Sequence, residues 1–456
     1  MTYSRVEPQV AAEPEPPAPG RPAKRDFTLL WAGSAISQTG TIAGATATPL
    51  LVLALDGSPM VASWATLATT LPSLLMQLPA GFLADVLDRR RIMFYSQIGR
   101  CCIGIALLFC LGFADHKIAC IIVAAFLDRT LSAFHLTAET TAIRHVSGPG
   151  VEVTANMARN EARQHIAISL GRPIGGLLYG IGRFAPYAFD VFSSLVALAT
   201  LRAIRTRRFQ AERPAGLDPD RTRAFLLDQR AAFRDGLRQV SRDRFLGLSV
   251  VLCAVANFVL QIVFLLSIVR AEQQQLSSSL IGFLLATSGL GGLLGSITAP
   301  LVLRNRVRGA TAVVCALAWA MLVSVVAFSS DPRLGLAAWG AASFVGAHMN
   351  VALAVQQVAT ISDAVLGRIT SFIRFVTGGA VPLGALCAGL LVRSENTHLA
   401  AVVATVLMGA AALSATLLVA RRNRHRLAGK RTAATGWARE WFADAPPATA
   451  DRHSPG

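Results

Sequence analysis

Ionisable side chains recur at helical spacing within one apolar stretch, AAFLDRTLSAFHLTAETTAI. Asp128, Ser132, His135 and Glu139 follow one another at i, i+4, i+7 and i+11, which places them on one face of a helix. Arg129 lies beside that face. Because carboxylates and imidazoles bind and release protons, the pattern indicates a site that carries protons or contacts a substrate.

Each of these side chains also has a structural interpretation. Asp128 and Arg129 can form a buried pair that only stabilises the fold. His135 alone is typical of a packed or water-bridged polar group. Glu139 can pair with an arginine of residues 89–91.

Two further charges lie deep in the apolar stretches that follow. Arg172 occurs in LGRPIGG, and Asp190 lies in the next stretch. If these stretches form consecutive antiparallel helices, the two side chains come together, as either a functional or a structural ion pair. Arg100 and Arg374 lie nearer to helix ends, and we expect their long side chains to reach the polar surface.

A dense group of charges, GFLADVLDRRR, separates two apolar runs. Its carboxylate Asp85 stands at a predicted helix end, where it can accept hydrogen bonds from the N-terminus of a neighbouring helix. The group predicts a latch that breaks and re-forms; the alternative is a plain positively charged anchor. The predicted latch residues are Gly81, Asp85, Asp88, Arg89 and Arg90.

The composition of the 456-residue chain shows what surrounds these charges. It is 53% hydrophobic and only 15% charged, with a mean hydropathy of +0.50. Soluble domains have about 25% charged residues. The chain therefore has too few charges to cover a soluble fold of this size, which indicates a surface that faces lipid.

Apolar segments recur along the chain, most with the ~20 residues that a ~30 Å hydrocarbon core requires. They predict an all-α membrane protein with twelve transmembrane helices, at about 27–54, 60–84, 92–113, 118–143, 160–182, 185–204, 245–270, 278–303, 309–329, 334–360, 369–392 and 398–420.

Basic residues indicate the orientation of these helices. If the N-terminus is inside, the outside loops hold only five of the 43 Lys and Arg residues: Lys117, Arg183, Arg270, Arg333 and Arg393. This asymmetry is typical of cytoplasmic loops that carry the positive charge. We therefore predict that both termini and the central loop are cytoplasmic. The net charge of +17 also favours anionic lipid. We expect no nucleic-acid partner, since no basic stripe alternates with aromatics.

The helices divide six and six. PIGGLLYG at 173–180 and PLGALCAG at 382–389 share Pro, Gly, Leu and Gly at equal spacing, which favours two pseudo-repeats. The predicted domains are a disordered N-tail at 1–26, a first bundle at 27–204, a central loop at 205–244, a second bundle at 245–420 and a C-tail at 421–456. The central loop predicts an amphipathic helix on the membrane surface, or otherwise a solvated linker.

The charged group GFLADVLDRRR resembles the signature loop of the major facilitator superfamily, between that family's helices 2 and 3. Gly81, Asp85, Arg89 and Arg90 match the pattern, whereas Val86 replaces the usual basic residue. Asp88 stands in place of the usual Gly. The resemblance covers residues 27–420. It implies the two-bundle transporter fold, a cytoplasmic latch and a substrate site between the two bundles.

The stretch LGRPIGGLLYGIGRFAPYAFDVFSSLVALATL resembles the branch that holds siderophore and antibiotic exporters, including the enterobactin exporter type. Exporters of this type often have an acidic residue in helix 1, where this chain has Thr41. Arg129 resembles the embedded helix 4 arginine of proton-driven drug exporters. Gly171, Gly175 and Gly176 match glycines of the antiporter signature, but Arg172 takes the place of its Pro.

We therefore predict a secondary transporter that exports a small amphipathic metabolite, siderophore or antibiotic against inward proton flow. The alternatives are an importer or facilitator of the same fold, or a membrane receptor that does not transport. No phosphate-binding loop, metal-ligand spacing or nucleophile with its base occurs, so we expect no enzyme activity, cofactor or metal. The expected partners are the substrate, protons and the lipid of the cytoplasmic membrane, and we expect a monomer with seven free cysteines.

Overall fold

The computed structural model describes residues 21–56, 58–146, 151–204, 219–303, 308–329, 331–360, 363–392 and 397–443, and within them it is helical apart from short turns. The first seven helices are α1 (Arg21–Asp56), α2 (Pro59–Leu75), α3 (Gln77–Val86), α4 (Arg89–Phe113), α5 (Lys117–Val146), α6 (Val151–Ile181) and α7 (Ala185–Ala203). The others are α8 (Pro219–Arg242), α9 (Arg244–Gln273), α10 (Ser278–Leu303), α11 (Arg308–Phe328), α12 (Pro332–Thr360), α13 (Asp363–Leu391) and α14 (His398–Ala443).

Every predicted membrane helix coincides with helix in the structure, which confirms the all-α fold class. Eight helices of the described part have the length and composition to cross a membrane by themselves. Many large apolar side chains on the bundle are exposed, among them Phe109 (65%), Phe113 (78%) and Met321 (63%). Such a surface is stable where it faces lipid instead of water.

One predicted helix, 60–84, is divided. Helix α2 ends at Leu75, and α3 begins at Gln77. Pro79 explains the break, because it has no N–H to donate to Leu75 and its ring clashes with that carbonyl. The charged group GFLADVLDRRR begins at Gly81, within α3, so α3 sets its direction partly independently of α2.

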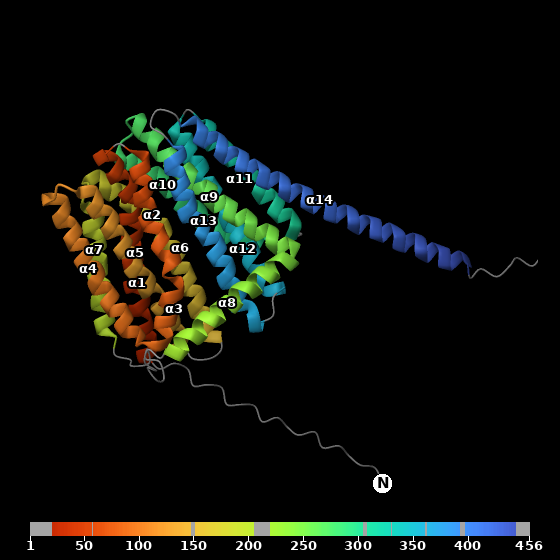
Figure 1. The fold of residues 1–456 in the computed structure, drawn as a ribbon, viewed down its shortest axis with the longest axis horizontal. Coiled ribbons are helices and arrows are strands. Elements are labelled where there is room, and N and C mark those ends of the chain that lie inside the picture. Colours follow the sequence, from red (N-terminus) through yellow and green to blue (C-terminus); the bar gives the residue numbers. More distant parts are fainter. Residues whose placement is uncertain are drawn as a thin grey trace, which may run out of the picture.

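The helices form two halves that stand side by side (Figure 1). In the first half, α1 packs against α6 and α7, and α4 packs against α5 and α7. In the second half, α9 packs against α13 and α14, and α10 packs against α12. The halves meet along two seams, one between α6 and α10 and one between α2 and α13.

The repeated PxGxLxxG segments occupy equivalent places in the two halves. A Cβ on Gly175 would lie 2.5 Å from the backbone oxygen of Ala43, so α6 approaches α1 closely. A Cβ on Gly384 would likewise collide with the backbone of Phe258, where α13 approaches α9. The shared glycines therefore perform the same packing task in each half, as expected of a repeat.

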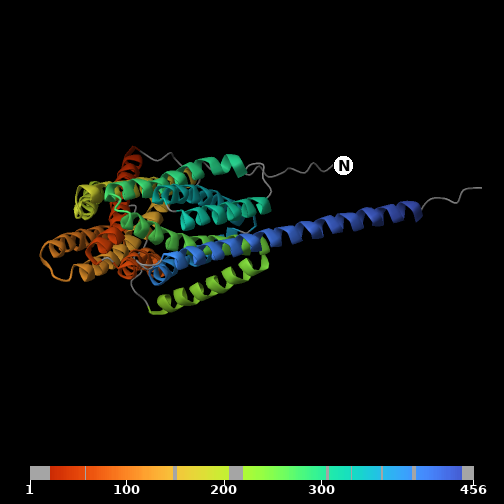
Figure 2. The same cartoon turned by 90° about the horizontal axis from the view of Figure 1, so that it is seen from above.

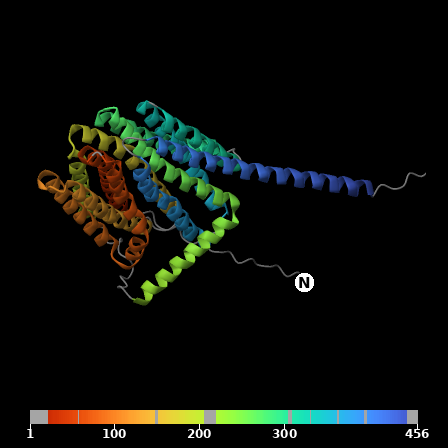
Figure 3. The same ribbon diagram turned by 45° about the horizontal axis from the view of Figure 1, so that its top comes forward.

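Two helices extend outside the bundle. Helix α8, within the predicted central loop, crosses one end of the molecule and packs on α13 (Figure 3). Helix α14 continues to Ala443, well past the predicted boundary at 420, and projects beyond the bundle (Figure 2). Its extension reads RRNRHRLAGKRTAA, which is rich in good helix formers.

Candidate functional site

Arg100 of α4 joins two carboxylates from different helices. Its Nε donates to Oδ1 of Asp128 on α5 at 2.7 Å, and its Nη2 donates to Oδ1 of Asp190 on α7 at 2.9 Å. The Arg100 side chain is only 2% exposed, while each carboxylate is 17% exposed. Because the guanidinium is shielded from bulk water, its attraction to the two carboxylates is stronger than that of a surface ion pair.

The other donors of Arg100 are also occupied. Nη1 donates to Oγ of Ser37 at 2.8 Å and to Oε1 of Gln97 at 3.4 Å, and Nη2 donates to Oγ1 of Thr41. Ser37 and Thr41 belong to α1, so one guanidinium holds four helices of the first half together. Such a fully bonded geometry is what makes a buried charge tolerable.

This arrangement corrects three expectations. Arg100 does not extend to a polar surface; it is buried at the centre of the charge cluster. Asp190 pairs with Arg100, not with Arg172. Asp128 likewise pairs with Arg100, and the adjacent Arg129 donates to the backbone oxygen of Thr41 at 3.0 Å. Helical spacing identified the face that holds Asp128, but it did not show which neighbouring helix faces it.

His135 and Glu139 lie further along the α5 stripe, and neither contacts Arg100 directly. His135 is buried, with its ring nitrogens 3.5 Å from Nε2 of Gln97 and 3.4 Å from the backbone oxygen of Met93. Glu139 forms a buried ion pair with Arg163 of α6 at 3.0 Å. The partner of Glu139 is therefore Arg163 and not an arginine of residues 89–91.

Arg172 lies on the seam between the halves. It donates to Oγ of Ser288 on α10, and nearby Oγ of Ser169 donates to the backbone oxygen of Gly289 at 2.8 Å. A Cβ on Gly289 would lie 2.5 Å from Cα of Ser169, so the two backbones approach closely. Arg172 thus contributes a contact between α6 and α10.

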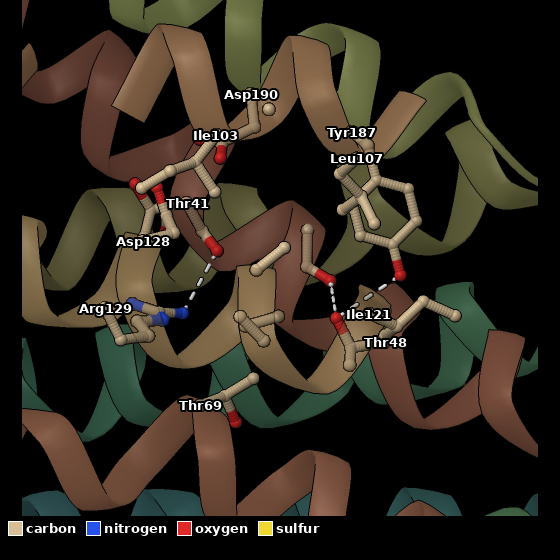
Figure 4. A pocket seen from close by; sticks show the side chains of 15 residues that line it. Thr41, Thr48, Thr69, Ile103, Leu107, Ile121, Asp128, Arg129, Tyr187 and Asp190 are labelled. Atoms are coloured by element: carbon tan, nitrogen blue, oxygen red, sulfur yellow. Dashed lines mark hydrogen bonds between the residues drawn. The ribbon is translucent and has the colours of Figure 1, made fainter. Parts of the chain in front are cut away.

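A cavity of about 40 Å³ lies next to the charge cluster, and its lining residues in the described part of the chain belong to the first half (Figure 4). Asp128, Arg129 and Asp190 border it, together with several hydroxyl groups. This volume admits a few water molecules, but it is well below the 300–1,000 Å³ of drug-sized sites. Among the described residues, no group of three His, Cys, Asp or Glu side chains is placed to hold a metal ion.

Residues 18–434 match the model of a family described as transmembrane secretion effectors. The chain belongs to this family, a branch of the major facilitator superfamily. The predicted resemblance to that superfamily is confirmed.

Two curated relatives are efflux proteins. The chain is 26% identical over 362 residues to the multidrug efflux pump Tap of Mycolicibacterium fortuitum. This match covers 77% of this chain and 85% of Tap. It is 25% identical over 198 residues to macrolide efflux protein A of Streptococcus pyogenes, covering 43% of this chain. That match spans about half, 48%, of the macrolide efflux protein.

Solved structures support the major facilitator fold. The nucleoside transporter NupG has a TM-score of 0.65 at 13% identity and covers 88% of this chain and 99% of its own. A bacterial homologue of the iron transporter ferroportin, solved in an inward-facing state, has a TM-score of 0.66 at 12% identity, with 86% and 98% covered.

Residues of the predicted latch bind helix ends. Asp88 caps α4 by accepting from the backbone N–H of Arg90 at 2.9 Å. The Nε of Arg89 donates to the backbone oxygen of Ala84 at 3.0 Å. A Cβ on Gly81 would meet no atom within 4 Å. The side chain of Asp85 lies outside the described residues.

Arg90 links this loop to the end of α7. Its Nη2 donates to the backbone oxygens of Leu201 and Ile204 at 3.2 and 2.8 Å. A cation at a helix C-terminus is favourable because carbonyl oxygens there lack partners within the helix. The arginine thus binds carbonyl oxygens at a helix end and not a carboxylate.

Sequence reasoning missed Arg100 as the central residue and did not consider Arg163. A usable signal exists for Arg100, which follows Gln97 by one helical turn on one face of α4. An arginine within an apolar membrane helix usually faces the interior of the bundle and pairs with a charged or polar group there.

Proposed function

We propose that this membrane transporter exports a small amphipathic metabolite, antibiotic or siderophore, and that inward proton flow drives the export. Its family and its efflux relatives support transport out of the cell. The printed names of those relatives, a macrolide efflux protein and a multidrug efflux pump, favour amphipathic drug-like substrates. We further propose a cytoplasmic membrane location with both termini inside.

The observation that supports proton coupling is that two carboxylates, Asp128 and Asp190, pair with the single guanidinium of Arg100. Arg100, Asp128 and Asp190 together hold one net negative charge, and Arg129 next to them brings the cluster to neutrality. One proton added to either carboxylate changes this balance while Arg100 keeps the other as its partner. Two carboxylates that share one cation titrate as a coupled pair, so the added proton belongs to the pair and not to one residue.

Protonation also provides a route to motion. Neutral Asp128 weakens the contact of α4 with α5, and neutral Asp190 weakens the contact of α4 with α7. We propose that substrate binding between residues 27–204 and 245–420 selects which contact is held, so that the two halves rock around the site by alternating access. Broken contacts along the seam of α6 and α10 would accompany this movement.

Inverted vesicles provide the test. They would contain the full chain and be offered a macrolide, an unrelated amphipathic drug and a catecholate siderophore under an imposed pH gradient, acid inside. We expect at least one compound to accumulate, and accumulation to stop when a protonophore collapses the gradient. Accumulation that persists without the gradient would overturn proton coupling, and no transport of any amphipathic compound would overturn the substrate class.

A further inference from the structure

The cavity beside Asp128 and Asp190 is suited to water. It encloses about 40 Å³, and a water molecule needs about 10–15 Å³ of such space together with two to four polar partners. The wall offers these partners on four helices: Thr41 and Thr48 on α1, Thr69 on α2, Asp128 and Arg129 on α5, and Tyr187 and Asp190 on α7. Three of them are charged, so the cavity is unlike the dry apolar voids of protein cores.

The cavity is elongated along α1. Thr41 lies beside the charge cluster, and Thr48 lies seven residues further along α1, which is about 10 Å at 1.5 Å per residue. Tyr187 lies in the first turn of α7, near the end of the bundle where α1 ends. By the charge asymmetry of the loops, that end faces the outside. The cavity therefore extends from the buried carboxylates towards the outer surface.

Two hydroxyl groups stand at the outer end of this space. The hydroxyl of Tyr187 donates to Oγ1 of Thr48 at 3.3 Å, and Oγ1 of Thr48 donates to the backbone oxygen of Gly44 at 2.8 Å (Figure 4). Both side chains are buried, at 7% and 2% exposure. Hydroxyl groups donate and accept, so they can pass a proton on to water and receive another.

Among the residues that the structure describes, charged groups face the cavity from two elements. Asp128 and Arg129 come from α5, and Asp190 comes from α7. Arg100 of α4 lies behind the two carboxylates, while α1 and α2 contribute only hydroxyl groups to the polar wall. A proton entering past Tyr187 thus meets no ionisable carboxylate before Asp190 and Asp128.

We propose that this cavity is a hydrated proton route from the outer surface to Asp128 and Asp190, with the hydroxyls of Tyr187 and Thr48 as its outer relay. The inference rests on the proposed proton coupling and adds that protons travel within the first half, apart from the substrate path between the halves. The occupant is water.

The test compares two substitutions that keep shape and remove a hydroxyl, Tyr187→Phe and Thr48→Val, in proteoliposomes of the full chain. The control is Tyr179→Phe, which removes the same group from a buried tyrosine of the same half that donates to Leu50 and does not line the cavity. Each variant is measured in substrate uptake driven by a pH gradient and in substrate exchange without a gradient.

We expect both cavity variants to slow gradient-driven uptake by about tenfold, the change that corresponds to ~1.4 kcal/mol in a barrier. Exchange should keep its wild-type rate, which shows that the variants are folded, and Tyr179→Phe should resemble the wild type in both measurements. Equal gradient-driven rates in Tyr187→Phe, Thr48→Val and Tyr179→Phe would overturn the proton route alone. A wild-type protein that ignores the gradient would overturn the proposed coupling itself, and the route with it.

Discussion

Arg100 is the residue on which the charge cluster depends. It is 2% exposed at the side chain and bonds to both carboxylates and to two α1 hydroxyls. A mid-bilayer charge costs roughly 2.5–3.5 kcal/mol even on insertion scales, so removal of its partner has consequences beyond one lost hydrogen bond. The cluster is stable because its charges are matched, and each partner is needed by the others.

We predict that Arg100→Ala destabilises the protein by about 3–5 kcal/mol, since it leaves two buried carboxylates without their cation. The triple variant Arg100→Ala/Asp128→Asn/Asp190→Asn should recover part of that loss, because no buried carboxylate is then left without a cation and Arg129 keeps its hydrogen bond to Thr41. Thermal unfolding of the purified protein in detergent measures both. A triple variant no more stable than Arg100→Ala would show that the side chains contribute by packing and not by charge.

Thr41 explains why sequence reasoning located the carboxylates without their partner. Exporters of the resembled branch often have an acidic residue at this place in helix 1, and its absence suggested that the charge lay elsewhere. In the structure the guanidinium of Arg100 donates a hydrogen bond to Thr41 and forms an ion pair with Asp190 on α7. Asp128 and Asp190 were predictable as site residues because they lie inside apolar segments. Their pairing with Arg100 depends on how each helix is rotated about its axis, which cannot be read from a single sequence.

At the scale of elements, the charged loop between α3 and α4 acts through helix ends. Arg90 bonds to two carbonyl oxygens at the end of α7, whereas Arg91 is 79% exposed and only 3.9 Å from Asp88. The two adjacent arginines therefore differ in their contacts: Arg90 bonds to a helix end, whereas Arg91 is exposed. This difference provides a matched pair of substitutions.

Arg90→Ala should lower stability by about 1.5–3 kcal/mol, the range for hydrogen bonds that involve a charged group. Arg91→Ala should change stability by less than about 1 kcal/mol, because exposed ion pairs contribute little. Chemical or thermal unfolding of the two purified variants makes the comparison. Equal effects would mean that the loop acts only as a positive anchor.

The close approaches of α6 to α1 and of α13 to α9 lead to another prediction. Gly384→Ala should destabilise the protein, since its Cβ would collide with the backbone of Phe258. Gly378→Ala in the same helix should be neutral or stabilise by about 0.5–1 kcal/mol, since a Cβ there meets nothing within 4 Å and Ala favours helix. Thermal unfolding should separate the two variants. If Gly384→Ala is tolerated as well as Gly378→Ala, the repeated motif does not serve close helix packing.

At the scale of the whole molecule, the length of the apolar segments was sufficient to predict where the helices lie, because lipid imposes a minimum span on every segment that crosses it. The break at Met76 and the continuation of α14 to Ala443 were missed for local reasons. Pro79 interrupts the backbone ladder, and the residues after 420 favour helix although they are too polar to span.

Both termini and the central loop should be cytoplasmic. Reporter fusions after Gly20, within 210–220 and after Lys430 should all report an inside location, since the outside loops hold only five of the 43 basic residues. An outside signal at any one of the three places would require a different number of membrane crossings.

If Asp128 and Asp190, which both pair with Arg100, bind the coupling proton, then transport driven by a pH gradient must depend on them in a way that substrate exchange does not. Proteoliposomes with wild type, Asp128→Asn or Asp190→Asn would be compared in accumulation under a pH gradient and in exchange of labelled for unlabelled substrate. Asparagine resembles the protonated acid in shape and charge, so we predict that exchange continues while the gradient no longer drives accumulation in at least one variant. The contrary result would be full gradient-driven accumulation in both single variants and in the double variant Asp128→Asn/Asp190→Asn. It would show that the coupling proton binds elsewhere.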